Sequence, residues 1–178
     1  MVKRILLFFC LFLSLGNIAA QQKVDFQPPL EGQLFLSGTF GELRGGHFHT
    51  GVDIKTDGVE GKRVYSAASG YVARIVVSPT GYGKALYIVH PNGYTTVYGH
   101  LQSFRKDIAQ YVRDVQFSKK SFAIDISLKP DQFVVNQGDF IALSGNSGGS
   151  GAVIFNKVKD KKAAWEFVKW FCSTDVQT

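Results

Sequence analysis

The chain of 178 residues is 45% hydrophobic and 19% charged, a composition that suits one globular domain. This hydrophobic fraction, together with 15 Phe and 7 Tyr, excludes an intrinsically disordered chain. The formal net charge is +6, but the basic residues are spread along the chain rather than gathered in one patch. We therefore expect no nucleic-acid partner.

The N-terminal segment 1–20 has the pattern of a secretory signal peptide. Lys3 and Arg4 precede an apolar run over residues 5–15, and small residues end the segment at Ala20. The apolar run is about half as long as the roughly 20 residues that a helix needs to cross a bilayer, which disfavours a transmembrane anchor. We expect an exported bacterial protein, located in the periplasm or in the extracellular space or cell envelope, with no stable membrane anchor after signal cleavage.

The segment that follows has the sequence pattern of a β protein. Residues 21–39 form an extended N-terminal lead-in, and from there to residue 150 short apolar runs alternate with Gly, Pro and Asn. Residues 85–90 and 94–98 flank the turn Pro91-Asn92-Gly93, which predicts a hairpin whose Asn-Gly pair supplies positive φ angles. The pattern predicts a mainly β fold, an antiparallel β sandwich or partly open barrel.

Two stretches depart from this pattern. In Gln102–Gln116 the apolar residues recur at spacings of four, three and four, which is typical of a short amphipathic helix. In the tail, over residues 160–173, apolar and aromatic residues again share one helical face. We therefore expect the β domain to carry short helices and a C-terminal helix.

All four histidines lie between positions 47 and 100. His49 and Asp53 are spaced i, i+4, and the intervening Gly51 and Val52 favour a turn that enters a strand over a helix. Such a turn can bring both side chains to one ion, since imidazole nitrogen and carboxylate oxygen are ordinary zinc ligands. A solvated loop histidine beside an aspartate that caps a turn fits the same spacing.

The other three histidines carry weaker signals. His100 follows Tyr98-Gly99 at the end of a predicted strand, where it either faces a groove or is an ordinary surface residue. His47 lies two residues before His49, so in an extended segment it faces the same side and could support a metal ligand or contact a substrate. His90, before Pro91, is expected to end a hairpin strand.

Residues 40–150 resemble the lysostaphin-type, or LytM-like, zinc metalloendopeptidases. The matching segments, in the family's order and spacing, are His49-Thr50-Gly51-Val52-Asp53, Val64–Gly70 with Tyr71-Val72, Tyr98-Gly99-His100-Leu101, and Gly138–Ser150. The resemblance implies the family's β fold, the duplicated hybrid motif, with zinc as cofactor and the peptide cross-links of peptidoglycan as substrate. It also implies His49 and Asp53 as zinc ligands and His100 as a catalytic residue that helps stabilise the transition state.

The resemblance stops short of a complete site. The family carries its third zinc ligand and its general base in an HxH motif shortly after the glycine-rich segment, but here Gly151–Phe155 follows and no histidine occurs after His100. The sequence therefore predicts a zinc metalloendopeptidase homologue whose active site is incomplete, with weak or no zinc retention and little hydrolysis. The alternative is a non-catalytic cell-wall-binding or regulatory module of the same fold.

The tail over residues 151–178 resembles a fragment of the extracellular solute-binding proteins of ABC importers. This resemblance implies a helical tail unrelated to the peptidase domain, created either by a junction of two coding sequences or by replacement of the end of a divergent family member. A β core that lacks its final strand would expose an unpaired edge, and we expect that the tail helix could cover it.

Overall fold

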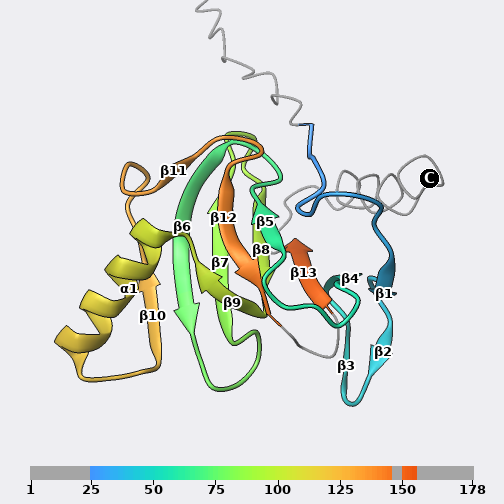
Figure 1. The fold of residues 1–178 in the computed structure, drawn as a ribbon, viewed down its shortest axis with the longest axis horizontal. Coiled ribbons are helices and arrows are strands. Elements are labelled where there is room, and N and C mark those ends of the chain that lie inside the picture. The colour runs from blue at the N-terminus through green and yellow to red at the C-terminus, as the bar shows by residue number, and fades with distance from the viewer. Residues whose placement is uncertain (1–24, 146–149, 156–178) are drawn as a thin grey trace, which may run out of the picture.

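The computed structural model describes residues 25–145 and, as backbone, residues 150–155 (Figure 1). The expected signal peptide over residues 1–20 and the tail from residue 156 onward lie outside these residues. Within them, no helix is long and apolar enough to cross a membrane.

The largest of the three sheets in the described residues has eight strands, and every neighbouring pair of strands in it is antiparallel. Its order is β1 (Leu36–Gly38), β4 (Gly51–Lys55), β13 (Ser150–Phe155), β8 (Thr95–Gly99), β7 (Lys84–Val89), β6 (Gly70–Val77) and β10 (Ile124–Ser127), with β11 (Val134–Val135) also paired to β6. In the described part of the chain this sheet is open, running from β1 at one edge to β10 at the other (Figure 1).

Two smaller sheets complete the β structure. One has the order β5 (Arg63–Tyr65), β12 (Phe140–Ser144), β9 (Leu101–Phe104), and the other is the short hairpin of β2 (Leu43–Arg44) and β3 (His47–Phe48). One hydrophobic core joins the eight-stranded and three-stranded sheets, with Ile75, Leu86 and Ile88 of the former and Ile141 of the latter fully buried. The predicted mainly antiparallel β fold is thus confirmed.

The predicted helix exists with shifted bounds. Helix α1 spans Lys106–Lys119 rather than Gln102–Gln116, and it lies at the β10 end of the molecule (Figure 1). Residues 101–104 form β9 instead, because Leu101 and Phe104 are buried and their backbone pairs with β12. On the inner face of α1, Ile108 and Val112 join the core.

The predicted hairpin is formed by β7 and β8. Gly93 has the expected positive φ, at 82°, but Asn92 does not. Asn92 instead accepts a hydrogen bond from the Tyr94 backbone nitrogen at Oδ1, 3.1 Å away. Its contribution to the turn is therefore a side-chain bond to the backbone rather than a left-handed conformation.

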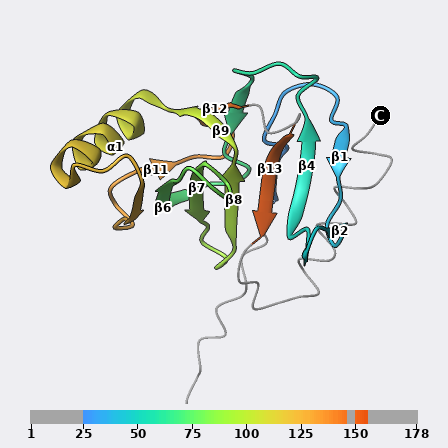
Figure 2. The ribbon, with the colours of Figure 1, turned by 90° about the horizontal axis from the view of Figure 1, so that it is seen from below.

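Strand β13 corrects the prediction for the start of the tail. Residues 151–155, expected to open a helical segment, pair as a strand between β4 and β8, as Figure 2 shows. The sequence Ala152-Val153-Ile154-Phe155 is apolar and rich in β-branched residues, which suits a central strand. The prediction of an unpaired strand edge at this place is wrong for the described residues, because β13 pairs with both β4 and β8. The helix expected further along the tail, beyond residue 155, stays a prediction.

Candidate active site

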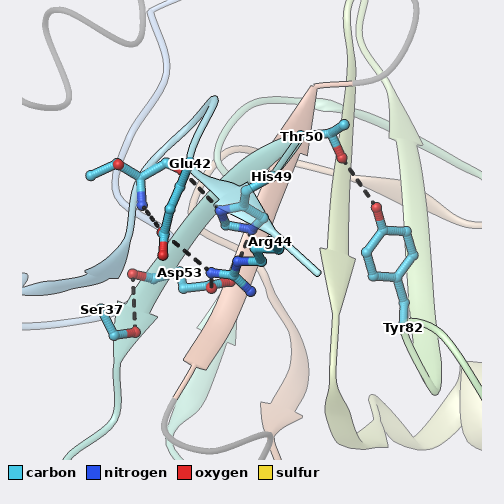
Figure 3. A network of polar contacts seen from close by, with 8 residues as sticks. Ser37, Glu42, Arg44, His49, Thr50, Asp53 and Tyr82 are labelled. Carbon is cyan, nitrogen blue, oxygen red and sulfur yellow. Dashed lines mark hydrogen bonds and ion pairs between the residues drawn. The ribbon is translucent and has the colours of Figure 1, made fainter. Parts of the chain in front are cut away.

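His49 and Asp53 meet where the chain turns from β3 into β4. The backbone of His49 is held to the β2–β3 hairpin, since its nitrogen donates to Glu42 O at 2.8 Å and its carbonyl accepts from the Gly41 nitrogen at 2.8 Å. Asp53 lies in the middle of β4. Both side chains are buried, and His49 Nε2 lies 3.3 Å from Asp53 Oδ1 (Figure 3). The structure thus brings the two predicted ligands together.

The orientation of the His49 ring follows from its other nitrogen. Nδ1 lies 3.0 Å from the Thr39 carbonyl oxygen, which can only accept, so Nδ1 carries the proton and Nε2 faces the carboxylate. Two ligands at about 2.0–2.1 Å from a tetrahedral zinc ion lie roughly 3.3 Å apart. The Nε2–Oδ1 separation therefore has the dimension of one edge of a zinc site.

The second oxygen of Asp53 is bound by a residue that the sequence did not single out. Arg44 Nη2, from β2, donates a short hydrogen bond to Asp53 Oδ2 and lies 3.6 Å from Glu42 Oε2 (Figure 3). The bond to Asp53 raises the pKa of Arg44. The Gly45-Gly46 pair, which returns the chain from Arg44 to His47, was the available signal for this hairpin.

The place of Arg44 depends on a glycine. Gly38 of β1 pairs with Asp53 across the sheet, and a Cβ at position 38 would lie 2.6 Å from Asp53 Oδ2 and closer still to Arg44 Nη2. Any larger residue would collide with the ion pair. Gly38 therefore provides the space in which the guanidinium and the carboxylate meet.

His100 lies at the junction of β8 and β9 with a positive φ of 54°, a conformation that costs free energy for a residue other than glycine. Its backbone nitrogen donates to Tyr82 O at 2.8 Å, and its ring meets the Tyr82 ring edge-on, 6.1 Å between centroids. The Tyr82 hydroxyl in turn lies 3.4 Å from Thr50 Oγ1 (Figure 3). Tyr82 therefore links His100 to the chain segment that carries His49.

The protonation of His100 responds to the same cluster. Burial lowers the pKa of His100 most; the Asp53 carboxylate raises it, and the nearby Arg44 and His49 lower it. His100 is thus within electrostatic reach of the His49–Asp53 pair, and its imidazole stays neutral at neutral pH.

The two remaining histidines lie apart from this cluster. His47 is exposed in β3 opposite Arg44, and the described residues show no hydrogen bond or ion pair from its ring to His49 or Asp53. Its contact with a ligand or substrate stays a prediction. His90 is buried at the end of the β7 strand, where it bonds the Ser69 carbonyl and the Thr96 hydroxyl.

The described residues do not complete a zinc site. Across 25–145, no group of three or more His, Cys, Asp and Glu side chains could hold a metal ion. On β13 the residue in register with both Asp53 and Gly99, the neighbour of His100, is Ala152, and alanine has no ligating atom. Two positions of a tetrahedral ion are thus matched, the carboxylate is shared with a guanidinium, and the residues that the structure describes supply no third protein ligand.

Comparisons with known proteins identify the fold. Residues 47–117 match the sequence profile of Peptidase family M23, whereas no curated protein matches the chain. The solved structure of a zinc containing peptidase from Vibrio cholerae aligns with a TM-score of 0.50 and 22% identity, covering 75% of this chain and 36% of that one. This chain thus spans about a third of that protein, and the likeness is one of fold.

Two further solved structures align at similar scores. The catalytic domain of the prophage-encoded M23 protein EnpA from Enterococcus faecalis gives a TM-score of 0.48 at 22% identity over 73% of this chain and 84% of that one. Lysostaphin gives 0.49 at 18% identity over 80% of this chain and 54% of that one. The resemblance seen in the sequence is confirmed over residues 47–117, which include His49, Asp53 and His100 and match Peptidase family M23.

Proposed function

We propose that this chain is an exported homologue of the zinc metalloendopeptidases that cleave peptide cross-links of peptidoglycan, with an active site that is incomplete. The observation that carries the proposal is the buried His49–Asp53 pair, 3.3 Å apart within the family segment, with Ala152 in the register position beside it. The 3.3 Å separation supports a pair of zinc ligands, and Ala152, in register beside Asp53, is a residue type without a ligating atom.

The other elements of the proposal have separate supports. Export to the periplasm or cell envelope is supported by the signal-peptide pattern over residues 1–20. The partner, peptidoglycan peptides, is supported by the family resemblance. Because the residues present do not complete a zinc site, we expect weak zinc retention and little hydrolysis.

The residues around the pair are suited to holding a peptide. A neutral His100 has one N–H donor and one acceptor nitrogen, so it can hydrogen-bond a peptide carbonyl without placing a charge against it. The hydroxyls of Thr50 and Tyr82 belong to an exposed contact and offer further hydrogen-bond partners. These groups can bind and orient a wall peptide whether or not it is cleaved.

A second function, a non-catalytic cell-wall-binding or regulatory module, is favoured by one observation. Arg44 already satisfies Asp53 Oδ2, so the carboxylate has a charged partner within the protein. Both functions include binding to peptidoglycan. They differ in whether zinc adds any hydrolysis at all.

The test is a sedimentation assay on insoluble peptidoglycan, with and without added zinc. The processed chain is incubated with the wall material, the bound fraction is measured in the pellet, and released peptides are measured by mass spectrometry. We expect sedimentation with peptide release near background, and zinc-dependent traces of release would favour the first function over the second. The His49→Ala variant serves as the matched control for any release.

Two outcomes would contradict the proposal. Efficient zinc-dependent release of cross-link fragments, lost in His49→Ala, would show that the site is complete. Failure of the folded chain to sediment with peptidoglycan from several bacterial wall types would remove the proposed partner.

A further inference from the structure

Asp53 is a carboxylate in an unusual place, the middle of a strand flanked on both sides. Its exposed fraction is 5%, and its strand β4 pairs with β1 on one side and β13 on the other. An ionised carboxylate removed from water is strongly destabilising unless a positive charge or several hydrogen bonds compensate it. In a zinc enzyme the metal ion would supply that charge, so the question is what supplies it here.

Arg44 meets the requirement directly. Its Nη2 donates to Asp53 Oδ2, and a guanidinium is charged at every physiological pH. A second carboxylate, Glu42, lies 3.6 Å from the same nitrogen. The two arms of the hairpin that carries Arg44 are joined at its base by the backbone bonds of His49 to Gly41 and Glu42, just before the chain enters β4.

The surroundings are shaped for this pair. A Cβ built on Gly38 would have Arg44 Nη2 and Asp53 Oδ2 as its two nearest atoms, both closer than real Cβ contacts come. The neighbouring Ser37 hydroxyl donates to the Asp53 carbonyl oxygen at 3.4 Å. The Arg44–Asp53 ion pair thus occupies the space that a side chain at position 38 would need.

We propose that Arg44 is the resident cation of this site, supplying the positive charge that balances Asp53 so that β1, β4 and the β2–β3 hairpin are held together without a metal ion. This inference goes beyond the proposed function and stands without it, because it concerns the charge balance of the site and not the wall partner.

A consequence for metal binding follows from the charges. A divalent cation between His49 Nε2 and Asp53 Oδ1 would lie close to the guanidinium on Oδ2, and like charges at such distances repel. Removing the guanidinium charge should therefore weaken the fold and at the same time make the site more receptive to zinc. A residue that only packs would produce the first effect without the second.

The test compares Arg44→Gln with a matched control, Arg74→Gln. Arg74 also forms a two-bond pair with a carboxylate, Asp125, but that pair is exposed on β6 and β10, away from the histidines. Thermal unfolding midpoints are measured for both variants and the unaltered chain, in EDTA and in excess zinc. Zinc binding is followed in parallel by competition with a chromophoric chelator.

The expected pattern is specific to Arg44. The unaltered chain should have the same midpoint in EDTA and in zinc. Arg44→Gln should unfold roughly 5–10 °C lower in EDTA and regain a part of that loss in zinc, with at least tenfold tighter zinc binding. Arg74→Gln should shift by at most about 2 °C and show no response to zinc.

Several results would overturn the inference. A midpoint of the unaltered chain that falls in EDTA would show that a metal, not Arg44, balances Asp53. Zinc stabilising the unaltered chain as much as Arg44→Gln would do the same. Should Arg44→Gln fail to fold, Arg44→Lys keeps the charge and must fold with an EDTA-insensitive midpoint; loss of folding in that variant too would contradict a role based on charge.

Discussion

The chain buries two histidines, His49 and His90, and the contrast between them shows how this fold separates structure from chemistry. Both residues are at most 8% exposed. Both place Nδ1 on a backbone carbonyl oxygen, that of Thr39 at 3.0 Å for His49 and that of Ser69 at 2.9 Å for His90. The two residues differ only in what the Nε2 atom faces.

For His90 that partner is neutral. Its Nε2 lies 2.9 Å from Thr96 Oγ1, which is 3.1 Å from the Tyr98 hydroxyl, and Tyr98 accepts from the Ala67 backbone nitrogen at 2.8 Å. Each polar atom of this buried chain has a partner, which is the condition for a stable polar network in a core. His90 is therefore a structural residue.

For His49 the partner is a carboxylate. Nε2 faces Asp53 Oδ1 at 3.3 Å, beside the Arg44 guanidinium. Charges concentrated in a buried place are costly to structure and useful to chemistry. The same residue type, buried in both places, thus belongs to a neutral network in one place and faces a buried charge pair in the other, where we propose a metal-type site.

The largest predicted effect is on stability. Changing His90 to Ala removes a buried ring and leaves the Ser69 carbonyl and the Thr96 hydroxyl without their partner, so we expect a loss of about 3 kcal/mol in the free energy of unfolding. His49→Ala should cost about 1 kcal/mol, because Asp53 retains Arg44. Urea unfolding of both variants measures the difference, and equal or reversed losses would break the comparison.

The second predicted effect is on metal affinity. Replacing Ala152 by His puts an imidazole in register with Asp53 and Gly99, and a third ligand should tighten zinc binding at least tenfold, or about 1.4 kcal/mol. Val153→His is the matched control, since successive residues of a strand point to opposite faces. The zinc affinities of both variants are measured by competition with a chelator. Equal affinities for the two variants would refute the register argument.

The third predicted effect is a pH dependence. Burial lowers the pKa of His90, so below the ordinary histidine pKa near 6.5 the unfolded chain binds a proton that the folded chain does not. Stability due to this residue is therefore complete above about pH 6.5 and declines as the pH falls. The lowered pKa of His100 acts in the same direction.

The measurement is urea unfolding at pH 7.5, 6.5 and 5.5. In His90→Gln the decline in unfolding free energy between pH 6.5 and 5.5 should be smaller than in the unaltered chain, because the buried titrating group is gone. An unchanged pH profile in this variant would show that the buried imidazole of His90 does not titrate as its environment requires.

The smallest predicted effect belongs to His47. Its side chain is exposed in the β2–β3 hairpin, so His47→Ala should change the free energy of unfolding by at most about 0.5 kcal/mol and leave zinc affinity unchanged. If it contacts the bound peptide as the sequence suggested, the variant will sediment less with peptidoglycan. A loss of zinc affinity would instead place His47 among the residues that support the metal-type pair.

Much of the site was predictable because it rests on local patterns. The turn that joins His49 to Asp53 and the place of His100 at the end of β8 follow from glycine, β-branched and aromatic residues close by in sequence. The β7–β8 hairpin follows in the same way from its turn. Such features need only the local conformation, which short sequence patterns specify well.

What was missed depends on long-range packing. The partnership of Arg44 with Asp53 depends on how the β2–β3 hairpin folds back over β4 and on the missing side chain of Gly38 in β1. Strand β13 was not predicted because its partners in β8 and β4 are 53 to 103 residues away in sequence. The predicted helix began too early, at residue 102 instead of 106, because residues 101–104 form a strand that pairs with β12.

The most direct test of the account is the zinc content of the folded, processed chain after dialysis against buffer with trace zinc, measured by atomic mass spectrometry. The site, with two ligand-like side chains and Arg44 on the second oxygen of Asp53, predicts far less than one zinc ion per chain. One zinc ion per chain, lost in His49→Ala, would contradict it.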